Sequence, residues 1–136
     1  MNKIVNLADN SSVYEVAKVT PLASAAQLSE RFGNQIYLKR EDEQSIHTFK
    51  LRGAYQKMAS LTESQTAKGV VASSAGNHAQ GVALAAKKLG VKAYIVMPLS
   101  TPKIKVEAVQ RLGGEVLLFG DVYDDEIGRA SRRARV

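Results

Sequence analysis

Short apolar runs alternate with longer segments of helical pattern over the second half of the chain, and this alternation constrains the fold more than any other feature. The runs at 69–72, 93–97 and 115–119 are rich in β-branched and other apolar residues. The segments 78–89 and 101–112 between them repeat apolar residues at the spacing of one helix face. Parallel strands need a crossover of about a dozen residues, which is usually a helix. The order therefore predicts an α/β fold, a three-layer parallel sheet of alternating strands and helices.

Threonine–proline pairs and glycines mark the expected ends of helices. Thr20-Pro21 and Thr101-Pro102 each predict a helix start, with threonine as the N-cap and proline in the first turn. Gly33 and Gly90 predict helix ends, because glycine readily adopts the left-handed conformation that closes a helix. A further helix is expected from Phe49, since the apolar residues that follow share one face: Leu51, Ala54, Tyr55, Met58 and Leu61.

The remaining segments carry weaker patterns. Val13 to Val19 is compatible with a short helix or strand, 36–38 with a short strand, and 39–44 with a charged loop. A last helical stretch is expected from about Tyr123. No internal repeat or low-complexity linker divides the chain.

Composition excludes several kinds of site. The chain has 136 residues, of which 45% are apolar, enough for one compact core, and it has no cysteine. Disulfides and thiolate metal sites are therefore excluded, and we predict no metal site from the two histidines, His47 and His78. The N-terminus shows no signal-peptide pattern, and no apolar run approaches the ~20 residues of a membrane span. We expect a soluble cytoplasmic protein without membrane partners.

The net charge of +6 depends on the last eight residues. Four arginines lie there without any acid, at positions 129, 132, 133 and 135, so the rest of the chain is close to charge balance. We expect an exposed terminus and no nucleic-acid partner. A basic tail that binds polyanions is the alternative.

Lys50 is the centre of the first candidate site. It is expected at the start of a helix, where the positive end of the helix dipole disfavours a second cation. Partial desolvation by Phe49 and Leu51 acts in the same direction, and both effects favour the neutral amine that attacks a carbonyl to form a Schiff base. Gly53 and Ala54 are small enough for a flat ring to approach the backbone. The alternative is an ordinary surface lysine on an amphipathic helix.

The loop 73–81 is the second candidate site, between an expected strand and an expected helix. Backbone N–H groups at a helix N-terminus bind anions, small residues leave these groups accessible, and Ser and Asn side chains add donors. The loop would therefore suit a substrate carboxylate. The alternatives are a tight turn in which Ser74 or Asn77 only caps the helix, and a His78 that is solvated instead of contacting a ligand. The loop is not a GxGxxG or Walker motif, so nucleotide binding has little support.

Taken together, the two sites resemble the fold-type II pyridoxal-phosphate (PLP) enzymes, and closely the threonine dehydratases (threonine ammonia-lyases). The resemblance runs from about Val13 to about Asp125. The lysine block and the loop, in this order and at this distance, are highly specific. The matching pieces are Thr20-Pro21-Leu22, the run from Tyr37 to Asp42, the run from Phe49 to Ala54, and the run from Ser74 to Gly81.

The resemblance implies a role for each matching residue. Lys50 would form the Schiff base with PLP and later move the α-proton of the substrate. Phe49 would pack on the pyridine ring, and Asn77 would bind the phenolic oxygen of the cofactor. The substrate carboxylate would be surrounded by Ser74, Ala75, Gly76, Asn77 and His78.

The implied reaction is the PLP-dependent dehydration and deamination of L-threonine to 2-oxobutanoate and ammonia, the first step of isoleucine biosynthesis. The run from Met97 to Val106 resembles the biosynthetic branch more than the catabolic one. Related serine racemases carry a proton-exchanging serine where this chain has Ala75, which favours elimination over racemisation. The alternatives are a PLP β-eliminase or β-replacement enzyme of the same fold that acts on serine or a derivative, and a non-catalytic fragment with a basic tail.

The resemblance also implies what lies elsewhere in the parent enzyme. Residues 1–48 would contribute to its large domain, and residues 49–136 would form a small α/β domain that is truncated at its C-terminus. The family holds the cofactor phosphate in a glycine-rich loop well downstream, and Gly113-Gly114 lies between a helix and a strand, the wrong context for that cradle. We therefore expect an N-terminal fragment of a homo-oligomeric enzyme, inactive by itself.

Overall fold

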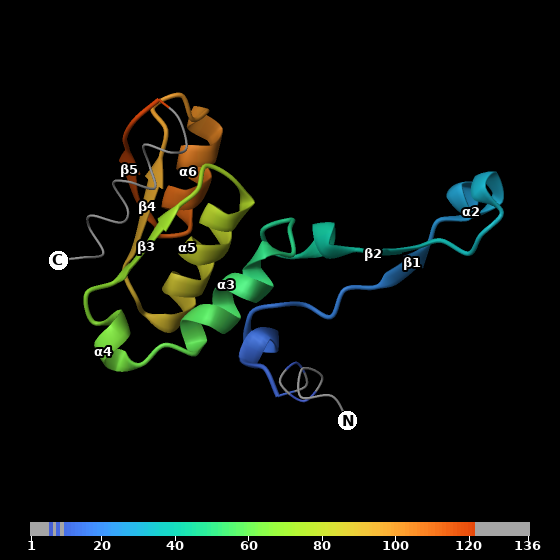
Figure 1. The fold of residues 1–136 in the computed structure, drawn as a ribbon, viewed down its shortest axis with the longest axis horizontal. Helices are drawn as coiled ribbons and strands as arrows, with labels where there is room; N and C mark the ends of the chain where they lie inside the picture. Colours follow the sequence, from blue (N-terminus) through green and yellow to red (C-terminus); the bar gives the residue numbers. More distant parts are fainter. Residues whose placement is uncertain (1–5, 7, 9, 122–136) are drawn as a thin grey trace.

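A three-stranded parallel sheet forms one layer of the body of the molecule. The computed structural model describes residues 6, 8 and 10–121 of the chain. Three strands pair in the order β3-β4-β5 and comprise Val70–Ser73, Ala93–Met97 and Glu115–Leu118. Helices α5 (Asn77–Leu89) and α6 (Lys103–Arg111) connect successive strands. The α/β class predicted from the alternation is confirmed (Figure 1).

The packing of the helices produces three layers. Helices α5 and α6 contact each other and both contribute to the core around β4, so they cover the same face of the sheet. Helix α3 (Lys50–Ala59) packs on α5 as the next layer, and this is the most extensive contact between two elements of the described chain (Figure 1). The site-bearing segments at the starts of α3 and α5 therefore belong to one packed unit.

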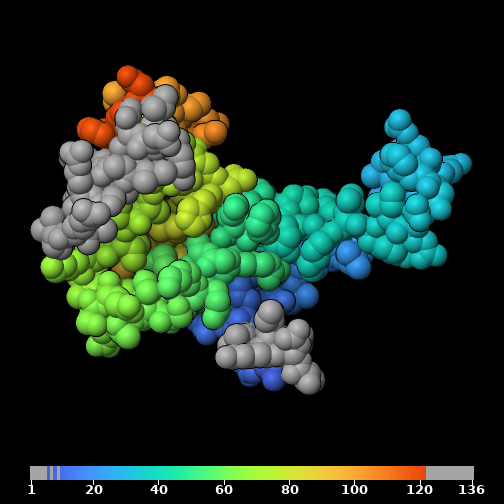
Figure 2. All heavy atoms as spheres, in the orientation of Figure 1, coloured from blue at the N-terminus to red at the C-terminus, as the bar shows by residue number. Residues whose placement is uncertain are grey.

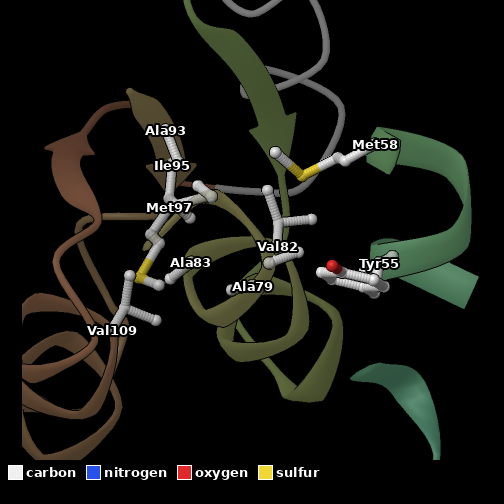
Figure 3. Close-up of a cluster of buried hydrophobic side chains, with 12 residues drawn as sticks. Tyr55, Met58, Ala79, Val82, Ala83, Ala93, Ile95, Met97 and Val109 are labelled. Carbon is white, nitrogen blue, oxygen red and sulfur yellow. The ribbon is translucent and has the colours of Figure 1, made fainter. Parts of the chain in front are cut away.

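The main core lies between β4, α5 and α3 (Figure 3). Ile95 and Met97 of the central strand are fully buried, and α3 contributes Tyr55 and Met58 from the opposite side of α5. Helix α5 presents mainly alanines to both neighbours, which lets the sheet and α3 approach it closely. Burying a side chain the size of Ile95 stabilises the fold by about 1.5–3 kcal/mol.

Residues 22–39 form an arm that projects from this body (Figures 1 and 2). The arm consists of strand β1 (Leu22–Ser24), helix α2 (Ala26–Phe32) and strand β2 (Tyr37–Lys39), and the two strands pair antiparallel. No residue of these three elements is buried, and large apolar side chains such as Phe32 are more than half exposed. The arm therefore presents apolar surface that the described body does not cover.

The prediction of a helix start at Thr20-Pro21 is wrong. The chain continues as strand β1, where Leu22 pairs with Lys39, and α2 begins only at Ala26. Thr20 does not cap a helix because its buried hydroxyl donates to Glu41 instead. The end of α2 at Gly33 is confirmed, with the glycine in the left-handed conformation at φ 62°.

The predicted end of α5 and the predicted start of α6 are both confirmed. Helix α5 ends at Gly90 in the left-handed conformation, and α6 begins after Thr101-Pro102 with Pro102 at the N-cap. Thr101 is not the cap, and its Oγ1 is buried without a hydrogen-bond partner among the described residues. The short helix α4 (Glu63–Thr66), which begins with a capping box, is not anticipated by the apolar pattern.

A 3-10 helix in the N-terminal segment packs on α3. Residues Ser12–Glu15 form the 3-10 helix η1, in agreement with a short element over 13–19. The helix expected from Tyr123 and the four tail arginines lie outside the described residues. Among the helices that are described, none combines the length and apolar character that crossing a membrane requires.

Candidate active site

Lys50 is the first residue of α3 and its side chain is exposed. Its Nζ lies 5.2 Å from the centroid of the Phe49 ring, and this ring is itself 57% exposed. Leu51 points the other way and is buried in a second apolar cluster with Val13, Ala17 and Ile46. The prediction that both apolar neighbours desolvate Lys50 is therefore wrong for Leu51, which anchors the helix instead.

The second apolar cluster and a strained residue fix the approach to Lys50. Ile46 and Thr48 are buried, whereas His47 between them has a φ of 54°, a conformation that costs free energy for a residue other than glycine. His47 is held there by hydrogen bonds from its backbone N–H to Gln44 and between its Nδ1 and the carbonyl of Asp42, each 2.9 Å long. The hydrogen bonds to Gln44 and Asp42, together with the burial of Ile46 and Thr48, thus hold the turn before α3 in one conformation.

Gly81 brings the two candidate sites together. A Cβ placed on Gly81 would lie 3.0 Å from the carbonyl oxygen of Lys50 and 3.3 Å from the backbone nitrogen of Leu51. The backbone of α5 therefore lies directly against the first turn of α3. Asn77 is four residues, or roughly 6 Å along the helix axis, before this contact. The start of α5 and Lys50 are consequently neighbours, as the resemblance requires.

The loop before α5 leaves the helix N-terminus uncapped. Gly76 occupies the N-cap position and no side chain caps the helix. Ser74 Oγ accepts a hydrogen bond from the Gly76 N–H at 3.3 Å, one residue before the helix, and Asn77 and His78 are exposed. The alternative in which Ser74 or Asn77 caps the helix is therefore not what the structure shows. An uncapped N-terminus of a helix this long favours an anion such as a carboxylate.

A cavity of about 260 Å³ lies between α3, β3 and α5. Gly53 and Ala54, one turn after Lys50, line it together with His78 and mostly apolar residues. No atom lies within 4 Å of a Cβ built on Gly53, so a flat group can reach the backbone there. Lys50, Ser74 and Asn77 do not line the cavity, which therefore adjoins the candidate site without forming it.

A polar cluster, which we call the Glu41 cluster, underlies the first turn of α3. Glu41 accepts hydrogen bonds from Arg52 Nε at 2.8 Å, from a terminal nitrogen of Arg52 at 2.9 Å, and from Thr20 Oγ1 at 2.6 Å. Gln44, which is 1% exposed, bonds the backbone of Lys18 at 2.9 Å through both ends of its amide. The hydrogen bonds from Arg52 hold the pKa of Glu41 down to about 2, with smaller contributions from Thr20 and Gln44.

We predict that the stability contributed by Glu41 depends on pH. The folded-state pKa lies below the ordinary value of 4.5, so this stabilisation is complete above about pH 4.5 and is lost as the pH falls toward 2. Allowing for the water around the pair, its size is on the order of 1–2 kcal/mol. Urea unfolding of the chain and of Glu41→Gln, followed by circular dichroism, should give a stability difference that is larger at pH 6 than at pH 3. An unchanged difference would contradict the low pKa.

Three residues that shape the site were part of sequence motifs, but the sequence alone assigned them no role. Arg52 and Gly81 lie inside the matched blocks, and Glu41 lies in the charged loop. Two signals were available in the sequence. Glu41 and Arg52 carry opposite charges on either side of Lys50, and Gly81 lies on the otherwise apolar face of the alanine-rich helix α5. Neither signal indicates which residues meet, because the partners are far apart in the sequence.

The chain is similar to several known proteins. Residues 13–136 match the family described as "Pyridoxal-phosphate dependent enzyme". The chain is 60% identical over 121 residues to "L-threonine dehydratase biosynthetic IlvA" of Pasteurella multocida, which covers 89% of this chain and 24% of that protein. The protein of the same name from Escherichia coli is 58% identical over 118 residues, covering 87% of this chain and 23% of that protein.

Solved structures show the same fold. The processed form of threonine deaminase isoform 2 from Solanum lycopersicum superposes with a TM-score of 0.89 at 47% identity, over 97% of this chain and 37% of that one. Maize serine racemase superposes with a TM-score of 0.84 at 35% identity, over 88% of this chain and 36% of that one. The chain spans about a quarter of the length of the curated relatives it matches. It belongs to the pyridoxal-phosphate dependent enzyme family.

Proposed function

We propose that this chain is the Lys50-bearing part of an enzyme that dehydrates and deaminates L-threonine to 2-oxobutanoate and ammonia, the first step of isoleucine biosynthesis. The observation that carries the proposal is the contact at Gly81, which holds an exposed lysine beside an uncapped helix N-terminus. The identity of 60% to a biosynthetic threonine dehydratase supports this substrate.

The residues of the chain fit one side of a PLP site. Lys50 would hold the cofactor through its amine, and the exposed Phe49 ring beside it offers a flat apolar surface for the pyridine ring. Asn77, exposed at the start of α5, would donate to the phenolic oxygen. PLP, when bound, supplies the electron sink that stabilises negative charge at the substrate Cα.

The start of α5 would orient the substrate. The loop 74–78 offers backbone N–H groups to a carboxylate, which would be fixed about one helical turn from the Lys50 contact. Lys50 would then accept the proton from Cα, since a fixed carboxylate restricts the direction of the Cα–H bond. Ala75 has no group that exchanges a proton, which favours elimination over racemisation.

The remaining proposals concern the parent protein. We propose that residues 1–48 contribute to its large domain and residues 49–136 to its small α/β domain; the exposed apolar arm supports the first part. The second apolar cluster crosses this boundary, so η1 and the turn before Lys50 pack on the small domain. We also propose a homo-oligomeric enzyme with an amino-acid substrate and a cytoplasmic location, the last from a cysteine-free sequence that suits a reducing compartment.

A graft tests the proposed function. In the Escherichia coli enzyme, the segment that matches this chain would be replaced by the residues of this chain, which are 58% identical to it. We expect the graft to release 2-oxobutanoate from threonine and to show the visible absorbance of bound PLP. Lys50→Ala should remove both, with a loss in kcat of at least about 10³-fold.

The graft also separates the alternatives. Faster turnover of serine than of threonine would favour a serine-directed β-eliminase of the same fold. A graft that folds and binds PLP but turns over neither amino acid would refute the proposal. The 136 residues alone, mixed with PLP, should show neither the absorbance nor turnover, because the family places the phosphate-binding loop outside them.

A further inference from the structure

We propose that the ion pair between Glu41 and Arg52 is the positioning device that sets the direction of Lys50. The inference rests on the function proposed above and deepens it, because it assigns positioning residues outside the cofactor and substrate contacts. Neither residue touches the loop before α5 in any hydrogen bond or ion pair of the described residues. Their effect on the reaction would pass through the first turn of α3.

The geometry of α3 relates Arg52 to Lys50. Residues two apart on an α-helix project about 200° apart around its axis, so Arg52 leaves the helix on nearly the opposite side from Lys50. Holding Arg52 on that side therefore fixes the rotation of the helix about its axis. A rotation of the first turn would change the direction in which the Lys50 side chain leaves the helix, relative to the start of α5.

Arg52 is held at several points. Two of its nitrogens bond the two oxygens of Glu41, at 2.8 and 2.9 Å, and one of them also donates to the Lys18 carbonyl at 3.1 Å. The Arg52 guanidinium carbon lies 5.4 Å from the centroid of the Tyr14 ring. The two charged side chains are 24% and 17% exposed, so the loss of either partner leaves a poorly solvated charge. A bidentate pair of this kind fixes direction as well as distance.

Lys50 is restrained from the other side as well. The α5 backbone at Gly81 lies against the Lys50 carbonyl, so the first turn of α3 is held between α5 and the Glu41 cluster. The side chains of Arg40 and Asp42 form a second ion pair nearby, 2.6 Å long, which is more exposed and makes no hydrogen bond or ion pair to α3 among the described residues. Asp42 holds His47 through its backbone carbonyl, which asparagine at this position keeps. The pair of Arg40 and Asp42 is the matched control, because it carries the same charges a few residues away.

The experiment compares variants in the graft. We expect Arg52→Gln to lower kcat about 10²-fold while KM changes less than about two-fold, because a displaced base affects the proton transfer more than binding. Arg52→Lys keeps the charge but not the two-pronged geometry and should recover part of the loss. Asp42→Asn should leave kcat unchanged. The visible absorbance of bound PLP should shift in both Arg52 variants and stay constant in Asp42→Asn.

A stability control separates positioning from folding. Val109→Ala removes buried volume from α6, remote from Lys50, and should lower the unfolding midpoint without changing kcat or the absorbance below that midpoint. In the 136-residue chain without cofactor, Arg52→Gln should speed hydrogen exchange of amides 51–54 more than that of amides 82–86. Unchanged kcat and absorbance in Arg52→Gln, in a graft that turns over threonine, would overturn the positioning role. A parent graft that folds and binds PLP but turns over neither amino acid would instead refute the proposed function. The hydrogen-exchange result would still test whether the ion pair holds the first turn of α3.

Discussion

Gly81→Val should destabilise the chain by about 3 kcal/mol or more, a large share of the stability of a small domain. A Cβ at this position would already lie 3.0 and 3.1 Å from the carbonyl oxygen and carbon of Lys50. These are backbone atoms of a packed helix, so they cannot rotate away as a flexible side chain would. Relief of the clash requires α3 and α5 to separate, and their contact is the most extensive in the described fold. Urea unfolding followed by circular dichroism measures the loss.

Gly53→Ala is the matched control for this prediction. Gly53 also lies inside a helix, but a Cβ added to it would have no atom within 4 Å apart from its chain neighbours and the backbone of its own helix. Replacing a helical glycine by alanine at an open position stabilises by about 0.5–1 kcal/mol. The two substitutions should therefore change stability in opposite directions, with Gly81→Ala between Gly81→Val and the parent. A stabilising Gly81→Ala would show that the helices do not approach as closely as the structure indicates.

The regular part of the fold could be predicted from the sequence because local patterns determine it. The central strand is found at the predicted residues, Ala93–Met97, since a continuous apolar run between a glycine and a proline suits a strand buried on both faces. Helix α5 and its end at Gly90 follow for similar reasons. Each of these sequence signals lies in, or within a few residues of, the strand or helix that it predicts.

Thr20 shows why other features could not be predicted. Its local context, a threonine before a proline, is typical of a helix start, but its hydroxyl bonds a carboxylate 21 residues away. The same applies to Arg52, whose partner Glu41 lies in another segment. Such pairs form only when the chain is folded, and they produce no periodic pattern in the sequence. The candidate lysine and loop were identified from their motifs, whereas the contact at Gly81 that joins them required the structure.

Tyr55 links the N-terminal segment to the core. It is 1% exposed and packs with Met58 and Val82 in the main core (Figure 3). Its hydroxyl donates to Glu15 at 2.6 Å. The carboxylate of Glu15 raises the pKa of Tyr55 to about 12, and burial adds to this effect. The phenol is a donor at neutral pH, and its bond to Glu15 adds to the apolar contacts that join η1 to α3.

Tyr55→Ala should accordingly lower the free energy of unfolding by about 3–5 kcal/mol, because it leaves a ring-sized cavity in the core and removes the bond to Glu15. Tyr55→Phe keeps the ring and loses only the hydroxyl, so we expect a cost of about 1 kcal/mol for the lost hydrogen bond, because water can solvate the exposed Glu15 carboxylate in its place. Glu15→Gln should change the stability less in the Phe background than in the parent chain, because the hydroxyl that the carboxylate bonds is already absent. Urea unfolding of the parent chain, Tyr55→Phe, Glu15→Gln and the double variant gives the cycle. Equal losses for Phe and Ala would place the contribution of Tyr55 in the hydroxyl alone, whereas an unaffected Phe variant would mean that the Glu15 contact does not stabilise the junction on which the start of α3 depends.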